Sequence, residues 1–209
     1  MSRFAISDIH GCPKTLIHLL EEIKFSKEDE LFLLGDFVDR GPDDIGVIEK
    51  IWTLHEQGYQ VKCSRGNHEQ MWLEGNKIGL DPSSSQTQKV LQWMETLPYF
   101  IETPGFLLVH AGLNFRHSDP MADLKAMIWK RYWQFDINLE WLGNRIIVYG
   151  HTPEPLNSIK FGIRRMKQRQ WVGIDSGCTH PPENGFGYLT ALNLDTGEGF
   201  HVSNIDGLA

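Results

Sequence analysis

Short apolar runs alternate with amphipathic stretches through the first half of the chain, and this alternation constrains the fold most. Runs typical of buried strands at residues 3–7, 30–35 and 59–63 enclose patterns typical of helices at residues 13–24 and 42–58. Proline stands at residues 13 and 42, where a first helical turn tolerates it, and glycine 58 suits a helix end. The pattern predicts parallel βαβ units.

The second half of the chain is richer in predicted strands. Strand-like runs occupy residues 105–110, 145–150 and 170–175, and two further strands flank the turn Asp195-Thr196-Gly197. Helices are expected at residues 69–76, 89–97 and 121–133, and a polar loop at residues 79–88. No linker or repeat divides the chain, so the sequence predicts an α/β (α+β-like) fold in one domain, residues 1–209.

Composition narrows the functional classes. The chain is 41% hydrophobic and 22% charged, without an export signal or an apolar run of the roughly 18 residues that a membrane span needs. Cys12, Cys63 and Cys178 lack CxxC spacing, which disfavours a disulfide framework or a thiolate zinc site. A net charge of −7 argues against nucleic acid as a partner, and the basic stretch 164–169 is interpreted as a solvated hairpin or turn. We expect a cytoplasmic protein without a membrane partner.

Polar side chains that can bind metals follow the apolar runs with unusual regularity. In an open α/β sheet, ligands gather beyond the carboxyl ends of the strands. A single such residue is more often a helix cap or a hydrogen-bonded histidine, but glycines beside most of them favour a common site. Carboxylate, imidazole and amide groups together suit borderline divalent ions, and two ions would attract a phosphate oxyanion. The candidates are Asp8, His10, Asp36, Asn67, His110 and His151.

The first two of these candidates are also expected to share a direction. Asp8 and His10 stand two residues apart in a segment expected to be extended, which would point both side chains to one side.

Five short motifs carry a family resemblance. DIHG at 8–11, GDFVDRGP at 35–42, RGNHE at 65–69, HAGL at 110–113 and GHTP at 150–153 resemble the successive motifs of PPP-type metallophosphatases. Within that family the chain is most similar to small bacterial and phage serine/threonine protein phosphatases of the bacteriophage lambda type. The resemblance implies a metallophosphoesterase fold, with two packed mixed β-sheets flanked by helices.

The resemblance also implies roles for individual residues. Asp8, His10 and Asp36 would hold one ion, and Asp36, Asn67, His110 and His151 the other, with manganese expected and iron, zinc, cobalt or nickel admitted. His68 would be the general acid and Asp39 its orienting partner. Arg40 and Arg65 would bind the phosphate, with Arg131 as a third candidate that could instead be a surface residue at a helix end. Glu69 is expected to brace the turn as its side chain leaves the site, and the cysteines to be small buried residues.

The expected function is metal-dependent phosphomonoester hydrolysis. A hydroxide bound by both metals would attack phosphorus in line, and the substrate would be a phosphoserine or phosphothreonine protein or peptide. A symmetrical dinucleoside tetraphosphatase is the alternative, and the DRG pattern at residues 39–41 favours the protein phosphatase. An inactive adaptor that binds metal or phosphopeptide is disfavoured because every expected ligand and the general acid are present.

Overall fold

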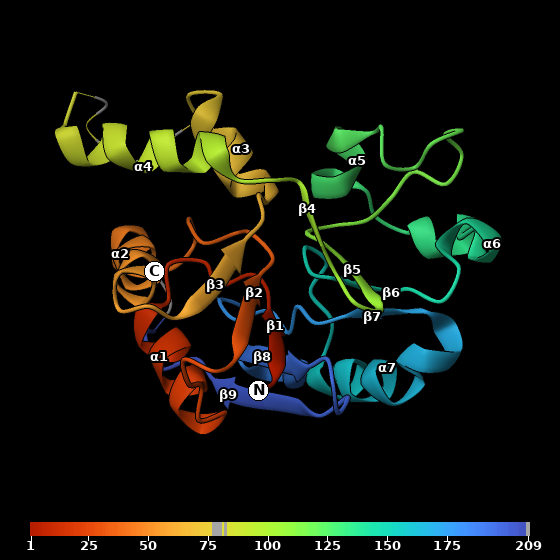
Figure 1. Ribbon diagram of the computed structural model, residues 1–209. Helices are drawn as coiled ribbons and strands as arrows, with labels where there is room; N and C mark the ends of the chain where they lie inside the picture. Colours follow the sequence, from red (N-terminus) through yellow and green to blue (C-terminus); the bar gives the residue numbers. More distant parts are fainter. Residues whose placement is uncertain (77–80, 82, 208–209) are drawn as a thin grey trace.

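The core of the protein consists of two mixed β-sheets packed against each other, with helices outside (Figure 1). The computed structural model describes residues 1–76, 81 and 83–207. One sheet has the order β3 (Gln60–Cys63), β2 (Glu30–Leu33), β1 (Arg3–Ile6), β8 (Tyr188–Asn193) and β9 (Gly199–Ser203). The other has the order β4 (Phe100–Thr103), β5 (Phe106–Val109), β6 (Ile146–Tyr149) and β7 (Trp171–Gly173). The predicted fold class is confirmed.

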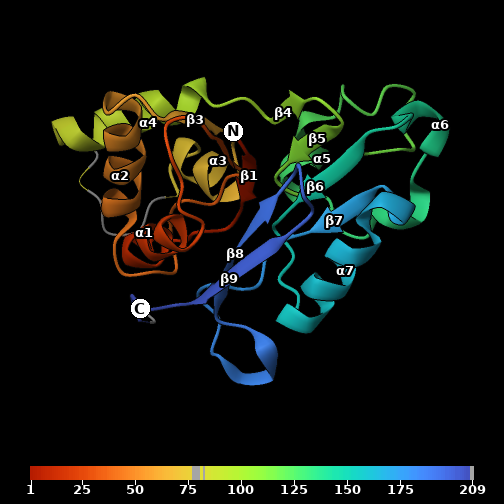
Figure 2. The same ribbon diagram turned by 60° about the horizontal axis from the view of Figure 1, so that its bottom comes forward.

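Both faces of the first sheet are buried, one against helices and the other against the second sheet. Strands β1, β2 and β3 pair in parallel through α1 (Pro13–Glu22) and α2 (Asp44–Glu56), which confirms the predicted βαβαβ unit. Phe4 and Ile6 pack in the same core as residues of α1 and α2, whereas Ala5 between them packs with β5, β6 and β7. Successive side chains of a strand point to opposite faces, so one short apolar run serves both interfaces. Figure 2 shows α1 and α2 on one side of β8 and β9, and α7 on the other.

The second sheet combines a hairpin with a parallel unit. Strands β4 and β5 are antiparallel, and β5, β6 and β7 are parallel, with α7 (Leu156–Arg169) between β6 and β7. The prediction of a hairpin or turn at residues 164–169 is wrong, because these residues form the last turns of α7. That helix buries Ile159, Ile163 and Met166, so its basic residues lie on the outer face of an amphipathic helix.

The remaining helices follow the predictions with shifted ends. Helix α3 (Asn67–Leu73) begins two residues earlier than expected, and α4 (Ser85–Thr96) covers the helix predicted at 89–97. The polar loop predicted at 79–88 lies partly outside the described residues, and its end belongs to α4. Pro13 begins α1 as expected, whereas Pro42 precedes Asp43, the N-cap of α2.

The helix predicted at residues 121–133 is divided. Within this range only α5 (Leu124–Trp129) is α-helical, because Lys130 is extended and Tyr132 has a left-handed backbone with φ of 58°. The 3-10 turn η1 (Trp133–Asp136) follows. A short helix α6 (Leu139–Leu142) and a second 3-10 turn η2 (Glu183–Gly185) complete the described elements. The C-terminal hairpin of β8 and β9 is confirmed. Within the described residues, no helix is long and apolar enough to cross a membrane.

Candidate metal centre

The loops after β1 and β2 are fastened to each other by backbone hydrogen bonds. The amides of Asp8 and His10 donate to the carbonyls of Gly35 and Asp36 over 3.2 and 2.9 Å. The expected extended segment from Asp8 to His10 is wrong, since β1 ends at Ile6 and these residues have φ of 49° and 47°. Left-handed backbone is uncommon outside glycine, and it clusters at functional sites. Further site residues with positive φ are Asp36, Asp39, Arg40 and His151.

Two glycines let the backbone approach the carboxylates of the centre. A Cβ atom at Gly66 would lie 2.2 Å from Oδ1 of Asp36, and one at Gly150 would lie 2.0 Å from Oδ2 of Asp8. Neither distance is compatible with a side chain. The requirement for glycine in RGNHE and GHTP therefore comes from the space that these carboxylates occupy.

One group of potential ligands gathers around Asn67. Its Oδ1 lies 2.8 Å from Nδ1 of His151 and 3.0 Å from Nε2 of His110, and that Nε2 lies 3.4 Å from Oδ1 of Asp36. Nδ1 of His110 bonds to the carbonyl of Leu34 over 2.9 Å, which leaves Nε2 to face the group. The structure thus brings together all four residues expected to hold one ion.

A second group shares Asp36 with the first. Oδ2 of Asp36 lies 3.6 Å from Nε2 of His10 and 3.8 Å from Nε2 of His68. Nδ1 of His10 bonds to the carbonyl of Val38, so its Nε2 is again the free nitrogen. Asp8 is farther away, with Oδ1 at 4.0 Å from Nε2 of His10, and both its oxygens accept the amide of His151. Asp36 therefore directs one oxygen to each group, and His68 joins the group that Asp8 was expected to complete.

The charge of the two groups suits divalent cations. Asp8, Asp36, Glu69 and Asp175 are all buried, and buried carboxylates need compensation by positive charge. Burial opposes a charge on His110, yet Asp36 and Asp8 raise its pKa to about 10. Burial and the neighbouring His110 lower the pKa of His151 to about 3. Imidazole nitrogens and carboxylate oxygens together are the donor set expected of a borderline dication site, and an ion there would displace the proton that His110 otherwise retains.

Glu69 braces the turn beside this centre, as expected. Its side chain stays at the site, whereas it was expected to leave it. The carboxylate is fully buried and accepts the amides of Asp36, Phe37 and Gly66 over 2.9, 2.8 and 2.8 Å. Burial and the charge of Asp36 raise the pKa of Glu69, while these amides oppose the shift. One side chain thus fixes the turn after β2 to the start of α3.

His68 is oriented by Asp39. Nδ1 of His68 lies 2.6 Å from Oδ2 of Asp39, whose Oδ1 accepts the indole N–H of Trp72 over 2.8 Å. Burial opposes a charge on the imidazole, but the hydrogen bond that it donates to Asp39 and the charge of Asp36 raise the pKa of His68 above its ordinary value. A protonated imidazole held in this way can donate a proton from Nε2. Trp72 was not among the predicted site residues.

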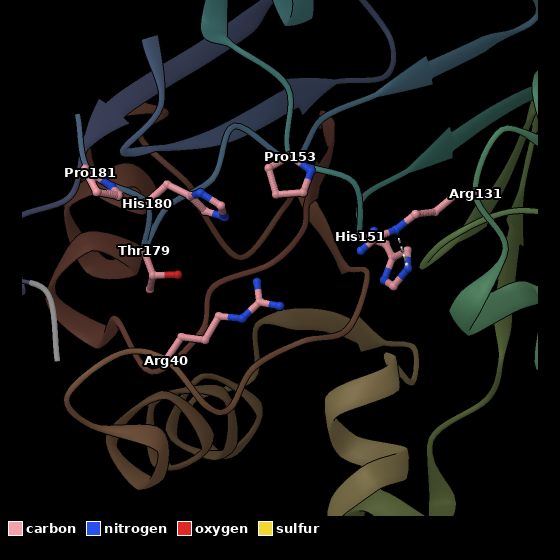
Figure 3. Close-up of a pocket in the computed structure, with 7 residues that line it drawn as sticks. All are labelled: Arg40, Arg131, His151, Pro153, Thr179, His180 and Pro181. Atoms are coloured by element: carbon pink, nitrogen blue, oxygen red, sulfur yellow. Dashed lines mark hydrogen bonds between the residues drawn. The ribbon is translucent and has the colours of Figure 1, made fainter. Parts of the chain in front are cut away.

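Arg40 and Arg131 line one cavity beside the two groups (Figure 3). The cavity encloses about 490 Å³ and also touches His151, Thr179 and His180. Arg40 comes from the loop after β2 and lies 3.1 Å from Nε2 of His10, and Arg131 comes from the segment after α5 and donates to Nε2 of His151 over 3.3 Å. Arg131 is exposed and lies just after α5, but its guanidinium is directed to His151, and its role in binding phosphate stays a prediction. Thr179 and His180 carry no motif and were missed.

The guanidinium of Arg65 is engaged elsewhere. It donates to Gln70 and Tyr99 through one nitrogen and to the carbonyls of Met94 and Glu95 through the other, over 2.9 to 3.2 Å. These partners tie the loop after β3 to the end of α4. The role of Arg65 in binding phosphate stays a prediction, and it would require the side chain to leave these acceptors.

Asp175 is a buried residue that the sequence analysis missed. It follows β7 as Asp8 follows β1, and the same rule could have identified it. Its carboxylate accepts the amide of Gly177 over 2.8 Å, and burial together with the charge of Asp8 raises its pKa well above the usual range. Cys12 and Cys178 are free and buried, in agreement with the expectation of small buried residues.

Comparisons with known proteins place the chain in a family. The Calcineurin-like phosphoesterase family matches residues 1–180. A symmetrical bis(5'-nucleosyl)-tetraphosphatase from Psychromonas ingrahamii is 28% identical over 180 residues, 80% of this chain and 63% of that protein. The corresponding protein from Shewanella baltica is 27% identical over 88% of this chain and 74% of its own length. The one from Nitrosomonas europaea is 32% identical over 60% of this chain.

This chain therefore spans 63% of the length of the Psychromonas relative and 50% of the Nitrosomonas relative.

Solved structures show the same fold. A proposed diadenosine tetraphosphatase matches 98% of this chain and 94% of its own, with a TM-score of 0.69 and 24% identity. A protein serine/threonine phosphatase from Saccharomyces cerevisiae matches 98% of this chain and 79% of its own, with the same TM-score of 0.69 and 16% identity. The two ligand groups that share Asp36 are consistent with the family match over residues 1–180. The chain belongs to the Calcineurin-like phosphoesterase family and is a metal-dependent phosphoesterase.

Proposed function

We propose that this chain hydrolyses dinucleoside tetraphosphates symmetrically, at a centre that holds two divalent ions. The observation that carries the proposal is the cavity in which Arg40 and Arg131 face the two ligand groups, since two separate guanidinium groups suit a substrate with several phosphates. The names of the curated relatives, at 27–32% identity, support this substrate class over a phosphoprotein.

Bound ions would activate a water molecule and neutralise phosphate charge. Asp8, His10 and Asp36 would hold one ion, with Asp36, Asn67, His110 and His151 holding the other. Arg40 and Arg131 would grip the phosphate oxygens and keep the chain of phosphates in line. The water oxygen bonds to one of the two central phosphorus atoms, the bond from that atom to the central bridging oxygen breaks, and His68 can supply the proton to the departing nucleoside diphosphate. Diadenosine tetraphosphate would give two molecules of ADP.

Hydrolysis of phosphoserine or phosphothreonine is a second candidate, and the pair of His68 and Asp39 favours it. A serine alkoxide is a poor leaving group that needs a proton as its bond breaks, whereas a departing nucleoside diphosphate is far more acidic. The imidazole of His68, held by a 2.6 Å hydrogen bond to Asp39, suits hydrolysis of the serine or threonine ester, which needs the proton more. An inactive adaptor is not favoured by any observation, because every expected ligand is present.

A direct comparison of substrates tests the proposal. With manganese supplied to both assays, we expect kcat/KM on diadenosine tetraphosphate to exceed that on any phosphopeptide at least tenfold, a transition-state preference of about 1.4 kcal/mol. Chromatography should show ADP as the sole nucleotide product. Formation of ATP and AMP would contradict symmetrical cleavage, and a higher kcat/KM on a phosphoserine peptide would establish the second candidate instead.

A further inference from the structure

A second cavity lies next to the one that holds Arg40 and Arg131. It encloses about 470 Å³, similar in size to the first, and its walls come from η1, the loop after β6, the end of α7 and β7. Half of the residues that line it are Phe, Tyr or Trp, whereas the first cavity is lined by none of these. The residues that matter here are Tyr132, Phe135, Tyr149, Thr152, Arg169 and Trp171.

Two chain segments contribute alternate residues to the two cavities. After β6, His151 and Pro153 line the first cavity, whereas Thr152 and Glu154 line the second. After α5, Arg131 lines the first cavity and Tyr132, with its left-handed backbone, lines the second. Because neighbouring residues of each segment line different cavities, the two segments form a common wall between them. A ligand anchored at Arg131 therefore begins at the border of the aromatic cavity.

The aromatic side chains at its mouth are strongly exposed. Phe135 is 88% and Tyr132 is 71% exposed, so packing in the core does not explain why these two residues are aromatic. Trp171 forms part of the wall, with the guanidinium of Arg169 at 4.9 Å from its ring centre. Planar aromatic rings and a guanidinium plane are the surfaces on which nucleobases stack.

Polar groups beside these rings can contact the edge of a base or a ribose. The hydroxyl of Tyr149 accepts a hydrogen bond from the amide of Gln134 over 2.6 Å, and its own hydrogen remains available as a donor. The hydroxyl of Thr152 and the half-buried carboxyl of Glu154 face the same cavity.

We propose that the aromatic cavity binds the nucleoside of a nucleotide whose phosphates lie between Arg40 and Arg131. This inference rests on the proposed function, because it supplies the subsite that would distinguish a dinucleoside tetraphosphate from a simple phosphate ester. The cavity accepts one nucleoside, so the second nucleoside of the substrate lies outside it.

The test uses inhibitors of a generic aryl phosphatase reaction and so does not require the nucleotide to be cleaved. ADP is compared with methyl diphosphate, which carries the same two phosphates without a nucleoside, in the presence of excess manganese. We expect ADP to inhibit the wild-type enzyme at least about fivefold more strongly, the lower range of one base stacked on aromatic side chains. Phe135→Ala should bring the ratio of the two inhibition constants close to one.

Three further variants separate stacking from disturbance of the fold. Phe135→Tyr keeps an aromatic ring and should retain most of the preference for ADP. Tyr132→Gly suits the left-handed backbone and should reduce the preference. Leu139→Ala removes another exposed apolar side chain, 50% exposed in α6, and should leave the ratio unchanged.

The outcomes distinguish this inference from the proposed function. Equal inhibition of the wild type by ADP and methyl diphosphate, or an unchanged ratio in Phe135→Ala, overturns the nucleoside subsite even if diadenosine tetraphosphate is hydrolysed. A strong preference for ADP together with no hydrolysis of diadenosine tetraphosphate overturns the proposed function alone. If Phe135→Ala instead lowers kcat/KM on phosphopeptides and leaves the ADP ratio intact, the cavity binds peptide side chains and the inference is wrong.

Discussion

The side chain of His68 faces a carboxylate at each ring nitrogen. Nδ1 bonds to Asp39 over 2.6 Å, and Nε2 lies 3.8 Å from Asp36. We expect His68→Asn to slow hydrolysis of alkyl phosphates by about 10²- to 10⁴-fold, the usual contribution of a positioned general acid. Aryl phosphates, which have better leaving groups, should lose less. Equal losses on both substrates, or loss of bound metal by elemental analysis, would show that His68 acts as a ligand rather than as the acid.

The three candidate arginines differ in what their guanidinium groups contact. Arg131 donates to His151 at the cavity, whereas Arg65 donates to the end of α4. We expect Arg131→Ala to weaken competitive inhibition by inorganic phosphate about tenfold and to leave the melting temperature nearly unchanged. Arg65→Ala should lower the free energy of unfolding by about 2 kcal/mol, because it leaves buried acceptors without donors. Inhibition assays and denaturant unfolding check both, and the reverse pattern would assign the phosphate role to Arg65.

The positions of the ligands were predictable from sequence, but their geometry was not. Polar residues that follow the parallel strands β1, β2 and β3 must converge at one edge of their sheet, so Asp8, Asp36 and Asn67 could be placed together in advance. The left-handed backbone at Asp8 and His10 arises from hydrogen bonds with the loop after β2, which no local pattern reveals. The direction of Arg65 depends on α4, about 30 residues away in the chain.

At the scale of elements, Glu69 connects α3 to the turn after β2. Its two oxygens accept three buried amides, those of Asp36, Phe37 and Gly66. We expect Glu69→Ala to lower the free energy of unfolding by about 3 kcal/mol, because three N–H groups lose their acceptor, and to weaken metal binding as the backbone of Asp36 shifts. Glu69→Gln keeps one acceptor oxygen and should cost less. Denaturant unfolding and metal titration measure both effects, and full metal affinity in Glu69→Ala would contradict the bracing role.

Element types were predicted well where an apolar pattern had one clear period. Successive side chains of the first sheet's strands pack in two different cores, whereas α1 and α2 each bury one face. The two-residue period of the strands and the 3.6-residue period of the helices are therefore both visible in the sequence. Strand β4 was missed because its burial pattern is mixed and it pairs only with β5. The basic stretch at 164–169 conceals the end of α7, since only Met166 within it is buried.

At the scale of the whole molecule, the metal centre lies where the two sheets meet. Asp8, His10, Asp36 and Asn67 follow strands of the five-stranded sheet. His110 and His151 follow β5 and β6 of the other sheet, and the amide of Gly150 donates to the carbonyl of His110 over 2.7 Å. Any ion held by Asp36, Asn67 and the two histidines would therefore link the sheets across their shared core.

This arrangement predicts that metal stabilises the entire fold. A ligand that binds only the folded state adds about 2.7 kcal/mol when its concentration is 100 times the dissociation constant. We expect manganese to raise the melting temperature of the wild type, and chelation to reverse the rise. Asp36→Asn should lose most of this increment, because Asp36 contributes an oxygen to each ligand group. Glu140→Gln removes one surface charge in α6 and should keep the full increment, which controls for the change in net charge. If manganese raised the melting temperature of Asp36→Asn as much as that of the wild type, the stabilising ion would bind elsewhere and the two sheets would not be linked through this centre.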